Sequence, residues 1–480
     1  MRNIYQWALA ATLSFSLFAC DFDTKNYQEL PGGEEYKTVQ DVQNGMTGAY
    51  NALGSYEFLG DYAVAFGDFF AGISDGSPST GHMYSMSTLT IEDTNAEMTD
   101  CWYYGFKVID RCTRTIAGAK KVMANKEALH LTDEDEANLA SYMGQCYALK
   151  ALANYYLVNL FAYPYKSGTE NLGLPLVKDE PIPPFTKVDR ATVGETYAQI
   201  NSNIKLAEDY LEQAAQQGVK LSAFYMGQMG LQALKARVCM DMEKYDDAAT
   251  AAKQAIKLKN AGDGTGSDNK PSDDNYQTMW RSLAITDEDI FTIAKNEADN
   301  LSSFALNTLY GSYLCTLTNS TVNAYSETDI RKGVIDVAGM TTLKYAGLPT
   351  SEATSNIPIF RKSEMSLIIA EVAARANNIA EARNYLLYTA KRNTAITSVD
   401  DLPGTTDELL TFISEERVRE FAGEGHRLYD ARRMGDKVKM SGFNDLFDIA
   451  KFVLPIPASE TNAGFMTQPN ENWDAAIPQQ

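Results

Sequence analysis

The sequence predicts a mainly α-helical protein, built from tetratricopeptide-like helical hairpins together with a largely irregular, loop-rich part. Three observations predict this class: alanines that recur at a 12-residue interval, amphipathic segments that begin with capping sequences, and two long stretches without helical periodicity. Hydrophobic residues make up 45% of the 480 residues and charged residues 22%, which is ordinary for a globular protein.

Two segments share a spacing of alanines that is typical of paired antiparallel helices. In ALKARVCMDMEKYDDAATAAKQAIKL, Ala236 and Ala248 stand 12 residues apart, and in SLIIAEVAARANNIAEARNYLLYTAK, Ala370 and Ala382 repeat the interval. Small side chains at these points let two helices approach closely, as in the tetratricopeptide unit of about 34 residues. Two unrelated hairpins would not be expected to share the interval. We therefore predict helical repeats over residues 36–59, 101–259 and 358–395.

Capping sequences mark where several of these helices begin. Thr132 is followed three residues later by Asp135, and Thr192 by Glu195, so each pair can form a capping box. The acidic run LTDEDEA is therefore interpreted as a helix start and not as a metal site. Trp102, in CWYYGF, is interpreted as a structural residue of a helix.

Two regions lack helical periodicity, residues 60–100 and 260–357. The first is rich in Gly, Ser, Thr and aromatic residues, and the second opens with the turn-rich sequence NAGDGTGSDNKPSDDNY. Long irregular insertions in a compact protein tend to carry function. For each aromatic residue here, the alternative interpretation is burial in the core. For the histidine, the alternative is that the side chain is simply solvated. The candidate ligand-binding residues are Asp75, His82, Tyr84, Trp280, Tyr310 and Tyr313, of which Trp280 is the strongest single candidate.

Residues 1–19 are predicted to be a lipoprotein signal peptide. Arg2 precedes a short apolar run, and a helix that spans a bilayer needs about 20 apolar residues. LFAC resembles a bacterial lipobox, in which Cys20 would be lipidated after cleavage; an N-terminal core helix is the alternative. Residues 20–35 are polar and contain Pro-Gly-Gly, which predicts a flexible tether. The rest, 36–480, is predicted to be one domain with a C-terminal motif region at 409–480.

Cysteine spacing and charge argue against several other classes of protein. The five cysteines after Cys20 include no CxxC spacing, so a zinc site or a disulfide framework is poorly supported. A net charge of −21 repels polyanions and disfavours nucleic acid. GDGTG and GEG are too short to cradle phosphate. A group of acids that lacks the residue order of a calcium loop is interpreted as a solvated loop: Asp263, Asp268, Asp273 and Asp274. We therefore predict no cofactor and no metal.

The stretch FISEERVREFAGEGHRLYDARRMGDK contains six acidic residues and five arginines. It could be a paired-carboxylate active site, a metal cluster or a helix held by ion pairs. Helical spacing predicts the pairs Glu415–Arg419, Glu424–Arg427 and Arg427–Asp430, each worth about 0.2–0.5 kcal/mol when exposed. A glycosidase needs two carboxyl groups about 5–9.5 Å apart across a cleft. Here every acid has an arginine within helical reach, so no acid is free to serve in such a pair. We predict a structural ion-paired helix and no enzyme activity.

Several blocks of the sequence are typical of one family. They include YNAL, CWYYGFKVIDRCTRTI, LKALANYYLVNLFAYPY, FRKSEMSLIIAEVAARANN, EERVREFAGEGHRLYDARRMG and KFVLPIPASETNAGFMTQPNENW. The chain resembles the SusD-like (RagB/SusD) family of outer-membrane lipoproteins of Bacteroidetes-type bacteria over most of residues 20–480. EERVREFAGEGHRLYDARRMG and PIPASE are the most specific blocks. Leu428 and Tyr429 stand where the family often has a Trp-Phe pair.

The resemblance implies a surface-exposed outer-membrane lipoprotein that binds oligosaccharide, or in some members peptide. It also implies that a helical face docks on a TonB-dependent transporter of the SusC type, to which the protein delivers the captured nutrient without covalent chemistry. Two alternatives are a membrane-anchored tetratricopeptide scaffold that binds only protein, and a glycoside hydrolase. The family has no fixed ligand motif to transfer to this chain. A net charge of −21 mildly disfavours strongly anionic polysaccharide.

Overall fold

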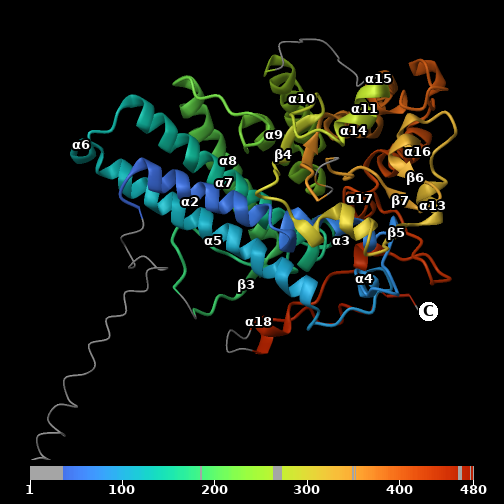
Figure 1. Ribbon diagram of the computed structural model, residues 1–480, viewed down its shortest axis with the longest axis horizontal. Helices are drawn as coiled ribbons and strands as arrows, with labels where there is room; N and C mark the ends of the chain where they lie inside the picture. The colour runs from blue at the N-terminus through green and yellow to red at the C-terminus, as the bar shows by residue number, and fades with distance from the viewer. Residues whose placement is uncertain are drawn as a thin grey trace, which may run out of the picture.

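The computed structural model describes residues 36–183, 186–262, 273–348, 351, 353–462, 467–475 and 477–478. Long helices form one side of this part of the protein, and short helices, short strands and loops form the other (Figure 1). The predicted fold class is confirmed: the protein is mainly α, with helical hairpins and an irregular part.

The helical side is a succession of helices, each packed on the next. Contacting pairs are α2 with α5, α5 with α7, α7 with α8, α9 with α10, α10 with α14, and α14 with α15. Within the described residues, every helix is too short or too polar to cross a membrane. The helices are α2 (Val39–Leu53), α5 (Ala96–Ala124), α6 (Lys126–Leu129), α7 (Asp133–Phe161), α8 (Val193–Gln216), α9 (Gln228–Asp241), α10 (Tyr245–Gly262), α14 (Lys362–Arg375) and α15 (Ile379–Ala390).

The local signals in the sequence explain these helices. The four alanines at the 12-residue interval are completely buried where α9 meets α10 and α14 meets α15, which confirms the predicted close approach. Both capping boxes form: the backbone N–H of Asp135 donates to Thr132 Oγ1, and that of Glu195 to Thr192 Oγ1, each at 3.1 Å. Trp102 lies inside α5 and is 3% exposed.

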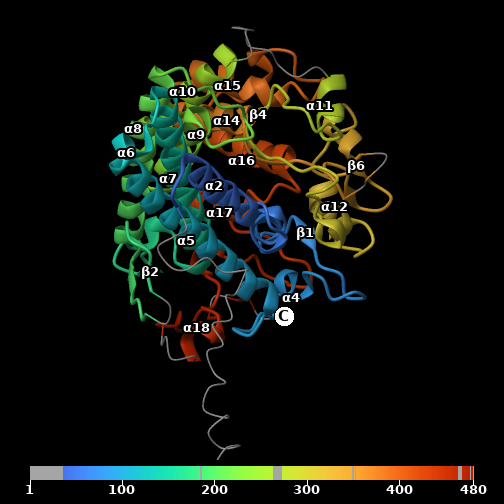
Figure 2. The same cartoon turned by 60° about the vertical axis from the view of Figure 1, so that its left-hand side comes forward.

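Short elements make up the other side. The strands pair in two-stranded antiparallel ladders, β1 with β5, β2 with β3, β4 with β8 and β6 with β7. The short elements and the two charged-motif helices are η1 (Tyr56–Gly60), α3 (Tyr62–Phe69), β1 (Ser74–Asp75), α4 (Tyr84–Ser87), η2 (Tyr165–Ser167), β2 (Leu172–Pro175), β3 (Arg190–Thr192), α11 (Asp273–Met279), β4 (Asp289–Ile293), η3 (Ser302–Phe304), α12 (Leu306–Tyr310), β5 (Thr316–Leu317), α13 (Asn319–Val322), η4 (Ile330–Val334), β6 (Ile335–Asp336), β7 (Thr341–Thr342), β8 (Ile357–Arg361), η5 (Val399–Asp401), α16 (Thr406–Phe421), α17 (Arg427–Met434), η6 (Ile449–Lys451) and α18 (Ala458–Asn462). Figure 2 shows α11, α12 and β6 on the side opposite to α6, α8 and α10.

The charged C-terminal motif is not one continuous helix. α16 ends at Phe421 and α17 begins at Arg427. Between them Gly423 and Gly425 adopt φ values of 85° and 76°, a left-handed conformation that glycine tolerates without strain. The expectation of a single ion-paired helix is therefore corrected to two helices joined by a glycine turn.

This break changes the ion pairs. Glu415 and Arg419, which lie within α16, form the expected pair at 3.8 Å. Glu424 lies in the turn, so helical spacing no longer places it beside Arg427. The two other expected pairs are replaced by tertiary contacts: Glu424 with Arg361 at 2.7 Å, Arg427 with Asp436 at 2.9 Å, and Asp430 with Arg417 at 2.7 Å.

Three of the motif's six acids, Glu416, Glu420 and Glu424, belong to a buried network of charges. Glu420, which is 0% exposed, accepts hydrogen bonds from Arg361 at 2.9 Å, Arg392 at 3.0 Å and Arg331 at 3.1 Å. These partners come from β8, from the end of α15 and from η4, so the network fastens segments that are remote in the sequence. We call it the charge network; its members are Glu288, Asp329, Arg331, Lys344, Arg361, Arg392, Glu416, Glu420 and Glu424.

Gly67 of α3 and Gly425 of the turn touch backbone to backbone. A Cβ atom on Gly67 would lie 1.9 Å from the carbonyl oxygen of Gly425, so one segment would have to move. We expect Gly67→Ala to lower the free energy of unfolding by about 1–3 kcal/mol, measured by urea denaturation. Gly48→Ala in α2 is the matched control, because a Cβ there would meet only the Arg111 side chain, at 3.8 Å. Equal losses in the two variants would contradict the close approach.

Candidate functional site

The two irregular regions of the sequence meet in space. β1 pairs with β5, with Ser74 opposite Leu317 and Asp75 opposite Thr316. Beyond the ladder, Thr80 Oγ1 donates to the carbonyl oxygen of Tyr313 at 2.7 Å. Segments more than 200 residues apart therefore form one surface, close to α3 and α4 in Figure 1.

A stacked pair of rings lies on this surface. The rings of His82 and Tyr313 are 3.6 Å apart between centroids and inclined by only 11°. Both side chains remain partly exposed, and Tyr84, two residues after His82, is 43% exposed. The Cys315 thiol donates to the carbonyl oxygen of His82 at 3.4 Å, which fixes the loop from the side of β5. Aromatic faces held in this way suit the apolar face of a flat ligand.

A carboxylate borders the surface. Asp75, in β1, accepts a hydrogen bond from Ser441 Oγ at 2.8 Å. Burial raises the pKa of Asp75, and the Ser441 hydrogen bond opposes this shift. Ser441 comes from the C-terminal region, outside both irregular regions. Sequence reasoning missed it, because only the packing of the 438–447 segment on α3 and β1 brings it here.

Trp280 and Tyr310 lie inside the protein and not on this surface. Trp280 is 5% exposed, and the charged groups of Lys344 and Arg361 lie 5.0 and 5.3 Å from its ring centroid. Tyr310 is 3% exposed and its hydroxyl shares a hydrogen bond of 2.7 Å with Ser74 Oγ. Rings enclosed in this way have no free face for a ligand, so the structure narrows the six candidates to Asp75, His82, Tyr84 and Tyr313.

Other candidates fall outside the described residues. These are Cys20 with the predicted signal peptide and tether, and the side chains of Asp263, Asp268, Asp273 and Asp274. Among the residues that the structure does describe, no group of three or more His, Cys, Asp or Glu side chains lies close enough to hold a metal ion.

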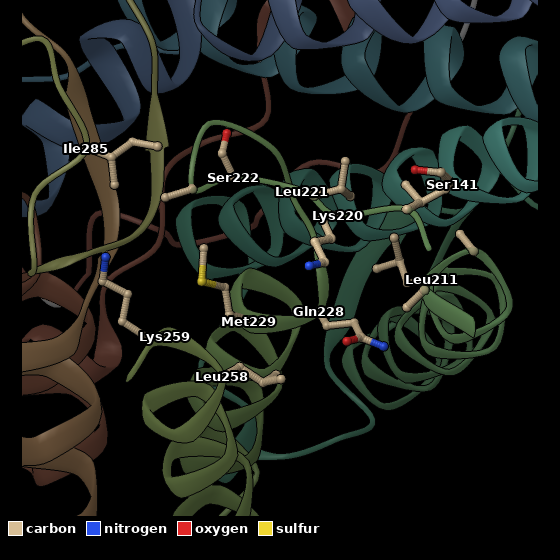
Figure 3. Close-up of a pocket in the computed structure, with 14 residues that line it drawn as sticks. Ser141, Leu211, Lys220, Leu221, Ser222, Gln228, Met229, Leu258, Lys259 and Ile285 are labelled. Atoms are coloured by element: carbon tan, nitrogen blue, oxygen red, sulfur yellow. The ribbon is translucent and has the colours of Figure 1, made fainter. Parts of the chain in front are cut away.

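A cavity of about 480 Å³ lies on the helical side, where α7, α8, α9 and α10 come together (Figure 3). Its walls are mainly aliphatic, from residues such as Leu211, Met229 and Leu258, and the Lys220 side chain reaches across it. The lining includes neither an aromatic ring nor a carboxylate. The His82–Tyr313 surface is therefore the better site for a hydroxyl-rich ring.

Comparison with known proteins assigns the chain to a family. The model of the SusD family matches residues 160–455, which is more than half of the chain and includes both charged-motif helices. This protein belongs to the SusD family. A search of the curated proteins gave no match.

Solved structures share the fold of this SusD family member. A candidate sugar-binding protein from Bacteroides vulgatus has 23% sequence identity and a TM-score of 0.79, over 92% of this chain and 99% of that one. A SusD superfamily protein from Bacteroides thetaiotaomicron has 23% identity and a TM-score of 0.75, over 91% and 100%. Surface glycan-binding protein A from Bacteroides fluxus has 19% identity and a TM-score of 0.65, over 91% and 99%. At these identities the likeness shows the fold alone.

Proposed function

We propose that the protein is a surface-exposed, outer-membrane lipoprotein that binds oligosaccharide nutrients and passes them to a SusC-like TonB-dependent transporter. The observation that carries the proposal is the partly exposed His82–Tyr313 ring pair. In a member of the SusD family, whose fold is shared with a surface glycan-binding protein, such a pair suits the face of a sugar ring. Asp75 and Ser441 add polar groups beside it.

The chemistry of the site supports binding and not bond cleavage. Hydrolysis of a glycosidic bond needs two carboxyl groups across a cleft. Among the four candidate residues Asp75 is the one acid. Glu416, Glu420 and Glu424 of the C-terminal motif are engaged by arginines in the charge network. The site therefore offers stacking and hydrogen bonding without an acid–base pair.

Anchoring and delivery rest on the sequence and the family. SusD family proteins are outer-membrane-associated lipoproteins that associate with SusC-like transporters. Cys20 is the predicted lipid attachment site, and several acyl chains on one residue would hold the protein firmly at a membrane. The stacked hairpins of α9, α10, α14 and α15 supply the helical face that would dock on the transporter.

Calorimetric titration with neutral oligosaccharides, and with peptides as the alternative ligand, tests the proposal. Replacing His82 and Tyr313 together with alanine is expected to weaken the free energy of oligosaccharide binding by about 0.5–1.5 kcal/mol for each ring that stacks. Tyr225→Ala is the matched control: this tyrosine is 42% exposed but precedes α9 on the helical side.

Wild-type protein that binds the transporter but neither class of soluble ligand would favour the alternative of a protein-binding scaffold. Release of shorter sugars, seen by chromatography, would instead indicate a hydrolase. An unchanged affinity in the folded double variant would remove the ring pair from the site.

A further inference from the structure

A second group of aromatic residues lies where η1, α3 and η3 meet the first turns of α5. The rings of Tyr56 and Phe304 stack at 4.0 Å with an angle of 12°. Tyr62 meets Tyr56 edge-on at 5.6 Å. Tyr103 and Tyr104 at the start of α5 meet edge-on at 5.6 Å. We call these five residues the tyrosine cluster.

The tyrosine cluster is open to solvent. Tyr103 is 58% exposed and Phe304 is 36% exposed, and the other three side chains are partly exposed. Lys107, one turn further along α5, lies 4.1 Å from the ring centroid of Tyr104 and 5.7 Å from that of Tyr103. Single hydrophobic side chains are common on protein surfaces, but a contiguous group of large ones often marks a binding site.

Polar groups accompany the rings. Glu57 is 8% exposed and accepts a hydrogen bond from Ser55 Oγ. Burial and the neighbouring Glu57 carboxylate raise the pKa of Tyr56 and of Tyr104, so both hydroxyls stay protonated and can donate hydrogen bonds. Asp61 is 3% exposed, and its Oδ1 has no hydrogen-bond partner among the described residues. Burial raises the pKa of Asp61 well above its ordinary value, which favours the protonated carboxyl group.

An unusual backbone holds these groups in place. Tyr56–Gly60 form a kinked turn, in which Phe58 is non-helical at φ −128° and ψ −114°. Side chains on Gly60 are excluded, because a Cβ there would lie 2.5 Å from the carbonyl oxygen of Ser55. The turn leaves the Tyr56 ring partly exposed and the Glu57 side chain buried.

The tyrosine cluster is adjacent to the His82–Tyr313 surface. Phe304 ends η3, α12 begins two residues later, and Tyr313 comes three residues after α12 ends. Asp61 directly precedes Tyr62 of the cluster and lies within electrostatic reach of Cys315, whose thiol donates to the His82 carbonyl. A chain of several sugars could therefore contact both surfaces.

We propose that the tyrosine cluster is a second oligosaccharide subsite that takes uncharged pyranose rings and discriminates against anionic sugars. The ring faces of Tyr103, Phe304 and Tyr56 match the apolar faces of pyranoses, and the hydroxyl and carboxylate groups match their hydroxyls. The carboxylates around the cluster outnumber Lys107; they are Glu57, Glu97 and Asp100. A uronate would face uncompensated like charge there. This inference rests on the proposed function, because the second subsite would bind a further part of the same oligosaccharide.

The test compares three main forms of the protein, with two control variants, by titration with neutral oligosaccharides of increasing length and with oligouronates of matched length. They are the wild type, a Tyr103→Ala, Phe304→Ala variant and a His82→Ala, Tyr313→Ala variant. We expect the first variant to bind long neutral chains about ten-fold more weakly and short ones unchanged. Tyr103→Trp should retain the affinity, and the Tyr225→Ala variant should match the wild type. Thermal melting checks that each variant is folded.

The outcomes separate this inference from the proposed function. Loss of affinity in the His82–Tyr313 variant alone overturns the second subsite and leaves the proposed function standing. Wild-type protein that binds no oligosaccharide overturns both. Weaker association with the transporter at unchanged sugar affinity shows that the tyrosine cluster is a protein-docking surface and overturns the subsite. Equal binding of oligouronates overturns the discrimination by charge.

Discussion

Glu420→Gln is expected to lower the free energy of unfolding by about 3–5 kcal/mol, the loss typical of breaking a buried ion pair from one side. Glu420 is completely buried and accepts hydrogen bonds from Arg331, Arg361 and Arg392. Glutamine has nearly the same shape but no charge. The three guanidinium groups would therefore stay buried with one counter-charge fewer, and water cannot reach them to compensate.

Chemical denaturation followed by circular dichroism measures this loss, provided that the slope of the transition is unchanged. Glu415→Gln is the matched control, since it removes the same charge from the same helix. The Glu415 side chain is 61% exposed, and its Arg419 partner is 3.8 Å away. Exposed pairs contribute about 0–1 kcal/mol, so the control should unfold almost as the wild type does. Similar losses in both variants would show that burial is not what makes Glu420 important.

The helices and their packing on the helical side could be predicted from the sequence, because the signals there are local. A capping box needs only Thr132 and Asp135, three residues apart. The 12-residue alanine interval likewise lies within one hairpin, so its consequence for packing could be predicted before any tertiary contact was known. The family assignment also came from local blocks of sequence, and the family match over residues 160–455 confirms it.

The ion pairs of the C-terminal motif could not be predicted in the same way. Helical spacing paired Glu424 with Arg427, but the turn at Gly423 and Gly425 separates them. The actual partners of Glu424, Arg361 and Lys344, lie 63 and 80 residues earlier in the chain. Nothing in the local sequence indicates a contact at that separation, which depends on how β8 packs against the turn.

The candidate site depends on tertiary contacts even more. His82 and Tyr313 were both candidates, but their separation of 231 positions gave no reason to place them ring on ring. Trp280 illustrates the opposite case. A tryptophan in a polar, irregular region has a sequence context typical of a ligand-binding residue. Its ring is nevertheless enclosed by Tyr276, Lys344 and Arg361. Burial of one residue is decided by the whole chain.

The stability of the protein is expected to fall steeply as the pH falls from about 4.5 to about 2. Although burial opposes ionisation, the guanidinium groups of Arg392, Arg361 and Arg331 lower the pKa of Glu420 from 4.5 to about 2. A carboxyl group with a lowered pKa in the folded state stabilises that state above the unfolded pKa, and this stabilisation is lost as the pH falls through the folded pKa. The difference corresponds to about 3 kcal/mol from this one group.

Comparison with Glu420→Gln isolates the contribution of Glu420, because the other carboxyl groups titrate in both proteins. At neutral pH the two proteins should differ by the full loss expected above. Below pH 4.5 the unfolded wild type takes up a proton at Glu420 that the variant cannot bind, so the difference in unfolding free energy should shrink. Near pH 2 a protonated glutamic acid and a glutamine carry the same charge and nearly the same shape, and the two stabilities should approach one another. A difference that stays constant from pH 7 to pH 2 would show that Glu420 is not ionised within the charge network.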